Sequence, residues 1–152
     1  MADAVVGIIM GSKSDEPTMQ KAAAILDELG IGFDMTVSSA HRNPERTGEY
    51  ASTAKERGLK VIIAGAGLAA ALPGVLAAHT TLPIIGVPIA SGALNGLDAL
   101  YAIVQMPPGV PVACVGIDNA RNAAVLAAQI LALGDDAIRG SLEAYKRKLS
   151  EG

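Results

Sequence analysis

Apolar runs alternate along this chain with longer segments in which apolar residues recur at helical spacing. The runs are nearly continuous, as is typical of strands buried on both faces of a parallel sheet. Strands are expected at 4–10, 33–38, 60–64, 84–87 and 112–117, and helices at 16–29, 44–57, 72–79, 97–104, 119–133 and 135–150. The repeated strand-then-helix order predicts an α/β fold: a flavodoxin-like three-layer αβα sandwich with a five-stranded parallel sheet and an extra C-terminal helix.

Residues with strong capping preferences mark the ends of the expected helices. Asn43 stands before the helix at 44–57 and is its expected N-cap. Gly30 and Gly58 follow the first and second helices, where a left-handed glycine commonly ends a helix. These residues support the element boundaries that the apolar pattern gives.

The composition narrows the class of protein. A length of 152 residues fits one domain, 1–152. The formal net charge of -3 and the absence of Trp argue against a nucleic-acid partner, which needs clustered Lys and Arg and aromatic side chains for stacking. Cys114 is the only cysteine, so we expect a buried apolar residue rather than a disulfide or a metal ligand. The first residues lack a basic segment of the kind that begins a signal peptide, so a cytoplasmic protein is expected.

No charged residue occurs between Lys60 and Asp98. Glycines and prolines divide this stretch into pieces shorter than the roughly 20 apolar residues that a membrane-spanning helix needs, so no membrane association is expected. A surface poor in charge is typical of an obligate interface. We therefore expect a homo-oligomer in which this stretch and the helix at 119–133 lie between subunits.

Two polar segments each follow an expected strand and begin an expected helix: 11–15 and 38–44. Parallel neighbouring strands bring both segments to the carboxyl edge of the sheet, where open α/β folds bind ligands. The first segment offers backbone N–H groups and the hydroxyls of Ser12 and Ser14, which suit a phosphate or a carboxylate. Ser14 and Asp15 could instead serve only as helix caps.

The two histidines differ in their surroundings. His41 lies in the second polar segment beside Arg42, and an imidazole titrates near neutral pH, so it is a candidate acid/base; an ordinary surface-loop histidine is the alternative. His79, at the end of an expected helix, is interpreted as a capping or interface residue. With no acidic cluster near either histidine, no metal site is expected.

The run 65–70 matches the dinucleotide-binding pattern G-x-G-x-x-A. Pro73 interrupts the following helix, and no Asp or Glu lies about 20 residues further on to hold a ribose. We therefore interpret the run as a flexible loop facing a substrate rather than an NAD site.

Several motifs together resemble the 5-(carboxyamino)imidazole ribonucleotide mutase family of purine biosynthesis, over nearly the whole chain. They are Gly11-Ser12-Lys13-Ser14-Asp15, Ser39-Ala40-His41-Arg42-x-Pro44, Ala64-Gly65-Ala66-Gly67, Leu72-Pro73-Gly74, Pro83-x-x-Gly86-Val87-Pro88, Gln105-Met106-Pro107-x-Gly109-x-Pro111-Val112-Ala113 and Asn119-Ala120-x-Asn122-Ala123.

The resemblance implies a flavodoxin-like subunit in a homo-octamer that moves a carboxylate from an exocyclic nitrogen to a ring carbon without metal, biotin or nucleotide. It implies His41 as the acid/base and Ser12, Asp15 and Arg42 as ligands of the ribose phosphate end of an aminoimidazole ribonucleotide. The substrate-binding residues expected in full are Gly11, Ser12, Ser14, Asp15, Ser39, Ala40, Arg42, Gly65, Ala66, Gly67 and Leu72.

The chain departs from the usual motif of this family at two loop positions, where Leu68 replaces a glycine and Ala71 a histidine. The sister activity of the family carboxylates aminoimidazole ribonucleotide directly with carbon dioxide, and its members typically have Lys after the motif histidine. Here Arg42 follows the mutase pattern, which favours the mutase; Asn43 stands where Thr is common. The alternatives are the direct carboxylase and a non-enzymatic phosphate- or nucleotide-binding regulator.

Overall fold

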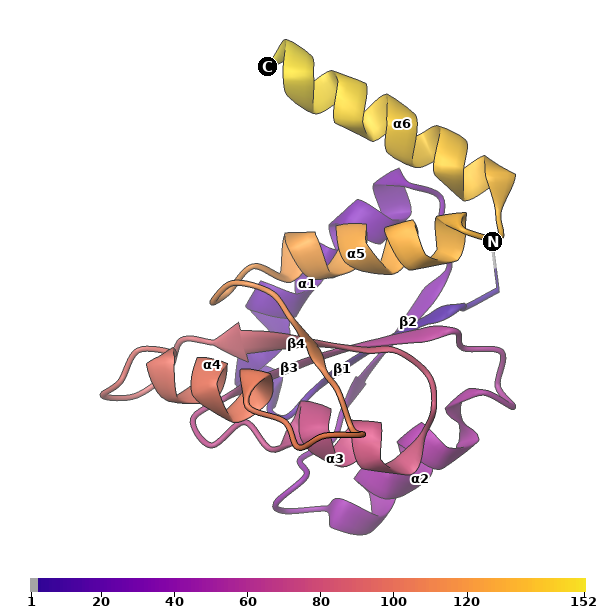
Figure 1. Cartoon of the computed structure of the whole chain (residues 1–152). Coiled ribbons are helices and arrows are strands. Elements are labelled where there is room, and N and C mark those ends of the chain that lie inside the picture. The colour runs from indigo at the N-terminus through magenta and orange to yellow at the C-terminus, as the bar shows by residue number, and fades with distance from the viewer. Residues whose placement is uncertain (1–2) are drawn as a thin grey trace.

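The computed structural model describes residues 3–152 and contains a parallel sheet between two layers of helices (Figure 1). Met1 and Ala2, part of the expectation about the first residues, lie outside the described range. The strands are β1 (Val6–Met10), β2 (Phe33–Val37), β3 (Val61–Gly67), β4 (Ile84–Ile89) and β5 (Ala113–Cys114). The helices are α1 (Glu16–Glu28), α2 (Pro44–Ala54), α3 (Leu72–His79), α4 (Leu97–Val104), α5 (Ala120–Ala132) and α6 (Asp136–Glu151), with a short 3-10 helix, η1 (Lys13–Asp15), before α1.

The sheet has the order β2-β1-β3-β4-β5 with all neighbours parallel. Val6 of β1 pairs with Phe33 of β2 on one side and with Val61 of β3 on the other. The order therefore reverses direction at β1, and a crevice opens there beyond the carboxyl ends of β1, β2 and β3. The predicted flavodoxin-like sandwich with a five-stranded parallel sheet is confirmed.

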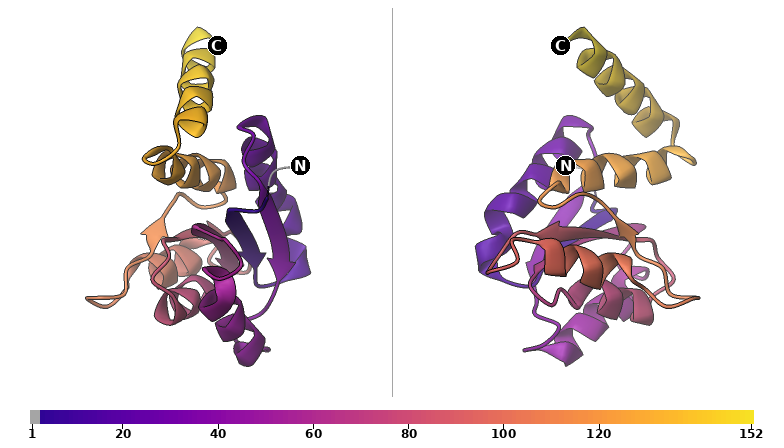
Figure 2. Two further views of the ribbon diagram at one scale, coloured as in Figure 1. Left: turned by 90° about the vertical axis from the view of Figure 1, so that its right-hand side faces the viewer. Right: turned by 60° about the vertical axis from the view of Figure 1, so that its left-hand side comes forward.

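Each face of the sheet has its own apolar core. Helices α1 and α5 cover one face, and α2, α3 and α4 cover the other (Figures 1 and 2). α6 packs on α5 and projects beyond the sandwich, and none of its residues is buried. No helix among residues 3–152 combines the length and the apolar character needed to cross a membrane.

The expected helix boundaries are largely confirmed, and the caps explain why. The Asn43 side chain accepts a hydrogen bond from the Arg46 amide at 3.3 Å, and Gly30 and Gly58 have φ angles of 73° and 90°. Two strands differ most from expectation. β3 continues to Gly67 because residues 62–67 pair with β4, whereas β5 has only two ladder residues, since Pro111 precedes it and left-handed Asp118 (φ 61°) follows.

The stretch without charges and the alanines of α5 are buried mainly inside the subunit itself. β3 and β4 form the centre of the sheet, and the α5 alanines pack in the same core as α1. The prediction that these segments lie between subunits is therefore wrong for β3, β4 and the buried face of α5. The central position of two strands already accounts for much of the missing charge.

Candidate active site

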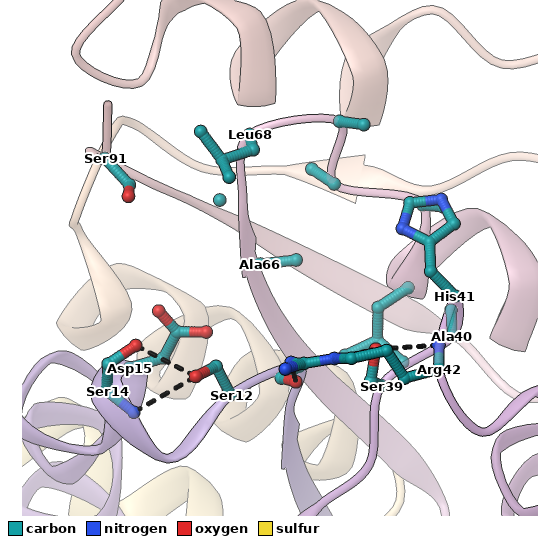
Figure 3. Close-up of a pocket in the computed structure, with 16 residues that line it drawn as sticks. Ser12, Ser14, Asp15, Ser39, Ala40, His41, Arg42, Ala66, Leu68 and Ser91 are labelled. Atoms are coloured by element: carbon teal, nitrogen blue, oxygen red, sulfur yellow. Dashed lines mark hydrogen bonds between the residues drawn. The ribbon is translucent and has the colours of Figure 1, made fainter. Parts of the chain in front are cut away.

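A cavity of about 470 Å³ opens at the carboxyl edge of the sheet, a size typical of small-molecule sites (Figure 3). It is formed by the loops after β1, β2 and β3, together with one residue of the loop after β4. Its lining residues are Gly11, Ser12, Ser14, Asp15, Ser39, Ala40, His41, Arg42, Ala66, Gly67, Leu68, Ala69, Ala70, Ala71, Leu72 and Ser91. The two polar segments singled out in the sequence thus meet in one cavity.

Every predicted site residue except Gly65 lines this cavity. Gly65 lies inside β3, where a Cβ would collide with the Met19 Sδ atom, and its carbonyl accepts a hydrogen bond from the Gly11 amide at 3.2 Å. Gly65, expected among the substrate-binding residues, therefore does not line the cavity. A glycine is needed there because α1 packs close to the strand.

The same geometry supports the rejection of a dinucleotide site at 65–70. In a dinucleotide fingerprint the glycines form the turn between a strand and a helix. Here Gly65 and Gly67 belong to the strand itself, and α3 begins only at Leu72.

The loop after β1 forms a small cluster of hydroxyl groups beside a buried carboxylate. Ser12 is the N-cap of η1: its Oγ accepts a hydrogen bond from the Ser14 amide at 3.3 Å and lies 2.9 Å from the Ser14 hydroxyl. Asp15, by contrast, makes no side-chain hydrogen bond as N-cap of α1, although only 9% of its surface is exposed. The capping alternative considered for Ser14 and Asp15 therefore fails for Asp15, and the side chain that caps in this segment is that of Ser12.

Burial raises the pKa of the Asp15 carboxyl group above its ordinary value, and a hydrogen bond with the Ser12 backbone acts more weakly in the opposite direction. Functional sites commonly contain a carboxyl group whose pKa is shifted by burial and which faces a cavity. Its oxygen atoms can accept hydrogen bonds from hydroxyl groups of a ligand.

Arg42 links the two polar segments. Its Nη2 donates to the Gly11 carbonyl at 3.1 Å, and its Nε donates to Ser39 Oγ at 3.2 Å. The Arg42 backbone amide donates to the same Ser39 oxygen at 3.1 Å. Figure 3 shows the guanidinium extended from Ser39 toward Ser12, so its positive charge lies between the two polar segments, where it can attract an anion.

His41 follows β2 and lies on the side of the cavity away from Ser12 and Asp15 (Figure 3). A buried hydrogen bond fixes the start of its loop, because the hydroxyls of Ser38 and Thr47 lie 2.7 Å apart. The end of the loop is fixed by the Asn43 amide, which donates to the Ser39 carbonyl at 2.8 Å. The imidazole is therefore carried on a loop tied to the sheet and to α2.

Five cavity residues were not named individually as binding residues, although the first three belong to the run 65–70 that was expected to face a substrate: Leu68, Ala69, Ala70, Ala71 and Ser91. Leu68 and Ala70 have left-handed φ angles of 53° and 39°. Such a conformation costs a non-glycine residue on the order of 1–2 kcal/mol, and strain of this kind tends to occur at functional sites. The departure from the family motif at Leu68 and Ala71 was the available signal in the sequence.

His79 does not line this cavity. It is exposed at the end of α3, and its ring lies against α2, where a Cβ on Gly48 would approach His79 Nε2 to 2.9 Å. Within residues 3–152, no three His, Cys, Asp or Glu side chains gather in a way that could hold a metal ion.

Comparison with known proteins gives the same picture over almost the full length. Residues 5–152 match the family described as AIR carboxylase. The chain is 61% identical to the N5-carboxyaminoimidazole ribonucleotide mutase of Pyrococcus abyssi over 144 residues, which is 95% of this chain and 83% of that protein. It is 53% identical to the phosphoribosylaminoimidazole carboxylase of Schizosaccharomyces pombe, covering 97% of this chain but 27% of the longer yeast protein.

Among solved structures, Treponema denticola PurE superposes with a TM-score of 0.87 at 31% sequence identity, covering 96% of this chain and 91% of that chain. The likeness in sequence and in structure therefore extends over the sheet, the helices and the cavity-forming loops. This chain belongs to the AIR carboxylase family.

Proposed function

We propose that this chain is an N5-carboxyaminoimidazole ribonucleotide mutase acting in purine (IMP) biosynthesis. The reaction converts 5-carboxyamino-1-(5-phosphoribosyl)imidazole to 5-amino-1-(5-phosphoribosyl)imidazole-4-carboxylate. One observation carries the proposal: His41 shares a single cavity with Ser12, Asp15 and Arg42. A proton-transfer group thus lies within reach of a ligand whose phosphoribosyl end is held by the other three. We take residues 1–152 as one mutase domain.

The polar groups of the cavity suit the phosphoribosyl part of this substrate. The Arg42 guanidinium and the hydroxyls of Ser12 and Ser14 can bind phosphate oxygens. The Asp15 carboxylate would repel a phosphate, but it can accept hydrogen bonds from ribose hydroxyls. The imidazole ring of the substrate then extends along Ala66 and Gly67 toward His41.

Proton transfer by His41 can serve both halves of the reaction. In the first half, the bond between the exocyclic nitrogen and the carboxylate carbon breaks, carbon dioxide leaves, and the nitrogen takes a proton from His41. In the second half, the electron-rich ring carbon attacks carbon dioxide and then returns its own proton to His41. Protons and electrons balance without a cofactor, and proton transfer of this kind accelerates a reaction by roughly 10²–10⁴-fold.

Direct carboxylation of aminoimidazole ribonucleotide is the second candidate, because the yeast relative is named as a carboxylase. It would use the same cavity but take carbon dioxide from solution. A non-enzymatic nucleotide-binding regulator is the third, and it would give His41 no role. The two enzymatic routes differ in the origin of the carboxyl carbon.

The origin of the carboxyl carbon is therefore the decisive measurement. The N-carboxylated substrate, labelled in its carboxyl carbon, is incubated with enzyme in excess unlabelled bicarbonate. We expect most of the label to remain in the ring-carboxylated product, because transfer inside a closed site outruns exchange with solvent. Product formation without added bicarbonate is expected as well.

Near-complete dilution of the label, together with efficient carboxylation of the uncarboxylated amine, would favour the carboxylase instead. If neither substrate turns over while adenine or flavin nucleotides bind, the regulator replaces both enzymes. A reaction without enzyme serves as the control, since it measures spontaneous decarboxylation under the same conditions.

A homo-oligomer, expected to be an octamer, is part of this proposal. Three exposed apolar side chains lie on one face of α4: Leu97, Tyr101 and Val104 are 43%, 59% and 49% exposed. Leu94, just before the helix, is 60% exposed. A continuous apolar face of this kind is typical of contacts between subunits.

Light scattering at micromolar concentration is expected to give a mass about eight times that of the 15.4 kDa subunit. Tyr101→Glu should shift the protein toward smaller species, because it buries a charge in the proposed interface. Leu133→Glu, at an exposed leucine away from α4, is the matched control and should leave the mass unchanged. A wild-type monomer would contradict the oligomer.

A further inference from the structure

Leu68 has an unusual combination of conformation and exposure. Its backbone is left-handed, with a φ of 53°, and 54% of its surface is exposed. A leucine gains little from such a position within the subunit, because its backbone is strained and its side chain is not buried. Leu68 nevertheless lines the cavity. The conformation thus places an apolar side chain at the wall of the site.

The structure leaves room for this side chain at Gly92, in the loop after β4. A Cβ at Gly92 would lie 2.9 Å from the Leu68 Cδ2 atom, and Gly92 itself has a φ of 70°. The start of this loop is fixed, since the Ala90 amide donates to Asp118 Oδ1 at 2.9 Å. The Leu68 side chain therefore reaches from the loop after β3 to the anchored loop after β4.

The side of the cavity on which Leu68 lies is mostly apolar. In Figure 3 Leu68 lies next to Ser91 and above Ala66, across the cavity from Ser12 and Arg42, and His41 lies further along the cavity. Ala69, Ala70 and Ala71 complete the segment that contains Leu68. The hydroxyls of Ser12 and Ser14, the carboxylate and the guanidinium thus lie across the cavity from Leu68, whose own side carries alkyl groups and the Ser91 hydroxyl.

We propose that Leu68 is the water-excluding wall of this site: it covers the reacting end of the substrate and holds released carbon dioxide beside the ring until the new bond forms. The inference rests on the proposed function. Carbon dioxide is small and has no net charge, so the cavity retains it by closing a path to solvent rather than by offering a charged ligand. A substrate in the cavity would also bury the alkyl group that the free protein leaves exposed.

Leu68→Ala in the labelled-carboxyl experiment tests this wall directly. We expect the share of label lost to the buffer to rise at least about tenfold, with free aminoimidazole ribonucleotide accumulating, because recapture competes with escape. The KM of the substrate should stay within about threefold, since the phosphoribosyl contacts are untouched. The product formed by Leu68→Gly should lose label to the same extent. The midpoint of thermal unfolding of this variant should rise, because glycine adopts a left-handed backbone without strain.

Three further variants separate water exclusion from general damage. Leu68→Met should restore most of the label retention, because methionine fills a similar volume. Gly92→Ala should lose label, because its new Cβ displaces the Leu68 side chain. Leu133→Ala, a change at a leucine that does not line the cavity and is 89% exposed, should behave as wild type.

If Leu68→Ala retains as much label as the wild-type protein, the proposed role of Leu68 is wrong, whereas the proposed function is unaffected. Loss of label accompanied by dissociation of the oligomer in light scattering would also overturn that role, because the leucine would then act between subunits. Failure of the wild-type protein to convert the N-carboxylated substrate at all would overturn the proposed function, and this inference with it.

Discussion

His41→Asn is expected to lower turnover by roughly 10²–10⁴-fold while substrate affinity stays within about tenfold. Asparagine keeps the polarity and the approximate size of histidine but cannot carry a proton between the exocyclic nitrogen and the ring carbon. The groups proposed to bind the phosphoribosyl part, on Ser12, Asp15 and Arg42, are unchanged. The loss should therefore appear in kcat rather than in binding, which calorimetry with the ring-carboxylated product would measure.

His79→Asn is the matched control, because the second histidine of the chain is exposed and does not line the cavity. It should retain full turnover. Retained turnover in His41→Asn would remove His41 from the acid/base role. A loss of affinity equal to the loss of turnover would instead indicate that His41 is a binding group.

The layout of the sheet could be predicted because it depends on local signals. Nearly continuous apolar strands indicate a parallel sheet, and caps such as Asn43 mark where helices begin. The meeting of the loops after β1 and β2 follows from the handedness of the crossover connection, so the sequence was enough to bring Ser12, Asp15 and Arg42 into one site.

The misplaced and missed residues share a different cause. Gly65 was expected to bind substrate because it belongs to a motif of the family, but its small size serves the packing of Met19 from α1. The Leu68 and Ser91 side chains line the cavity because of the backbone conformation of the loops after β3 and β4. In the first loop Leu68 itself is left-handed, and the apolar periodicity of a sequence does not reveal such a residue. Contacts between distant segments decide such positions, and a single sequence does not record them.

The uncharged stretch was misread for a related reason. A run without charge predicts burial, but it does not say whether the covering surface belongs to the same chain or to another copy. β3 and β4 are covered by the helices of their own subunit, whereas the exposed face of α4, at Leu97, Tyr101 and Val104, is not. Only the three-dimensional arrangement separates these two cases.

Asp15→Asn is expected to weaken binding of the ring-carboxylated product by about 10- to 150-fold, equivalent to roughly 1.5–3 kcal/mol for a hydrogen bond to a charged group. The same change should make the empty protein more stable at pH 7. Burial raises the pKa of this carboxyl group, so the folded chain favours the neutral form more strongly than the unfolded chain does. Asparagine removes the charge and keeps an oxygen that accepts a hydrogen bond.

The sign of the pH dependence follows from the same shift. Because the folded pKa lies above the unfolded value, the contribution of Asp15 to stability is fully present below the unfolded pKa and is lost as the pH rises through the folded pKa. The advantage of Asp15→Asn in urea unfolding should therefore be largest at neutral pH and should shrink as the pH falls. Asp27→Asn, at an exposed carboxylate of α1, is the control for the loss of a carboxylate and should leave binding unchanged. A variant that is less stable than wild type at pH 7 would show that the carboxylate supports the fold; a more stable variant that binds more weakly would show that its burial is a cost retained for the substrate.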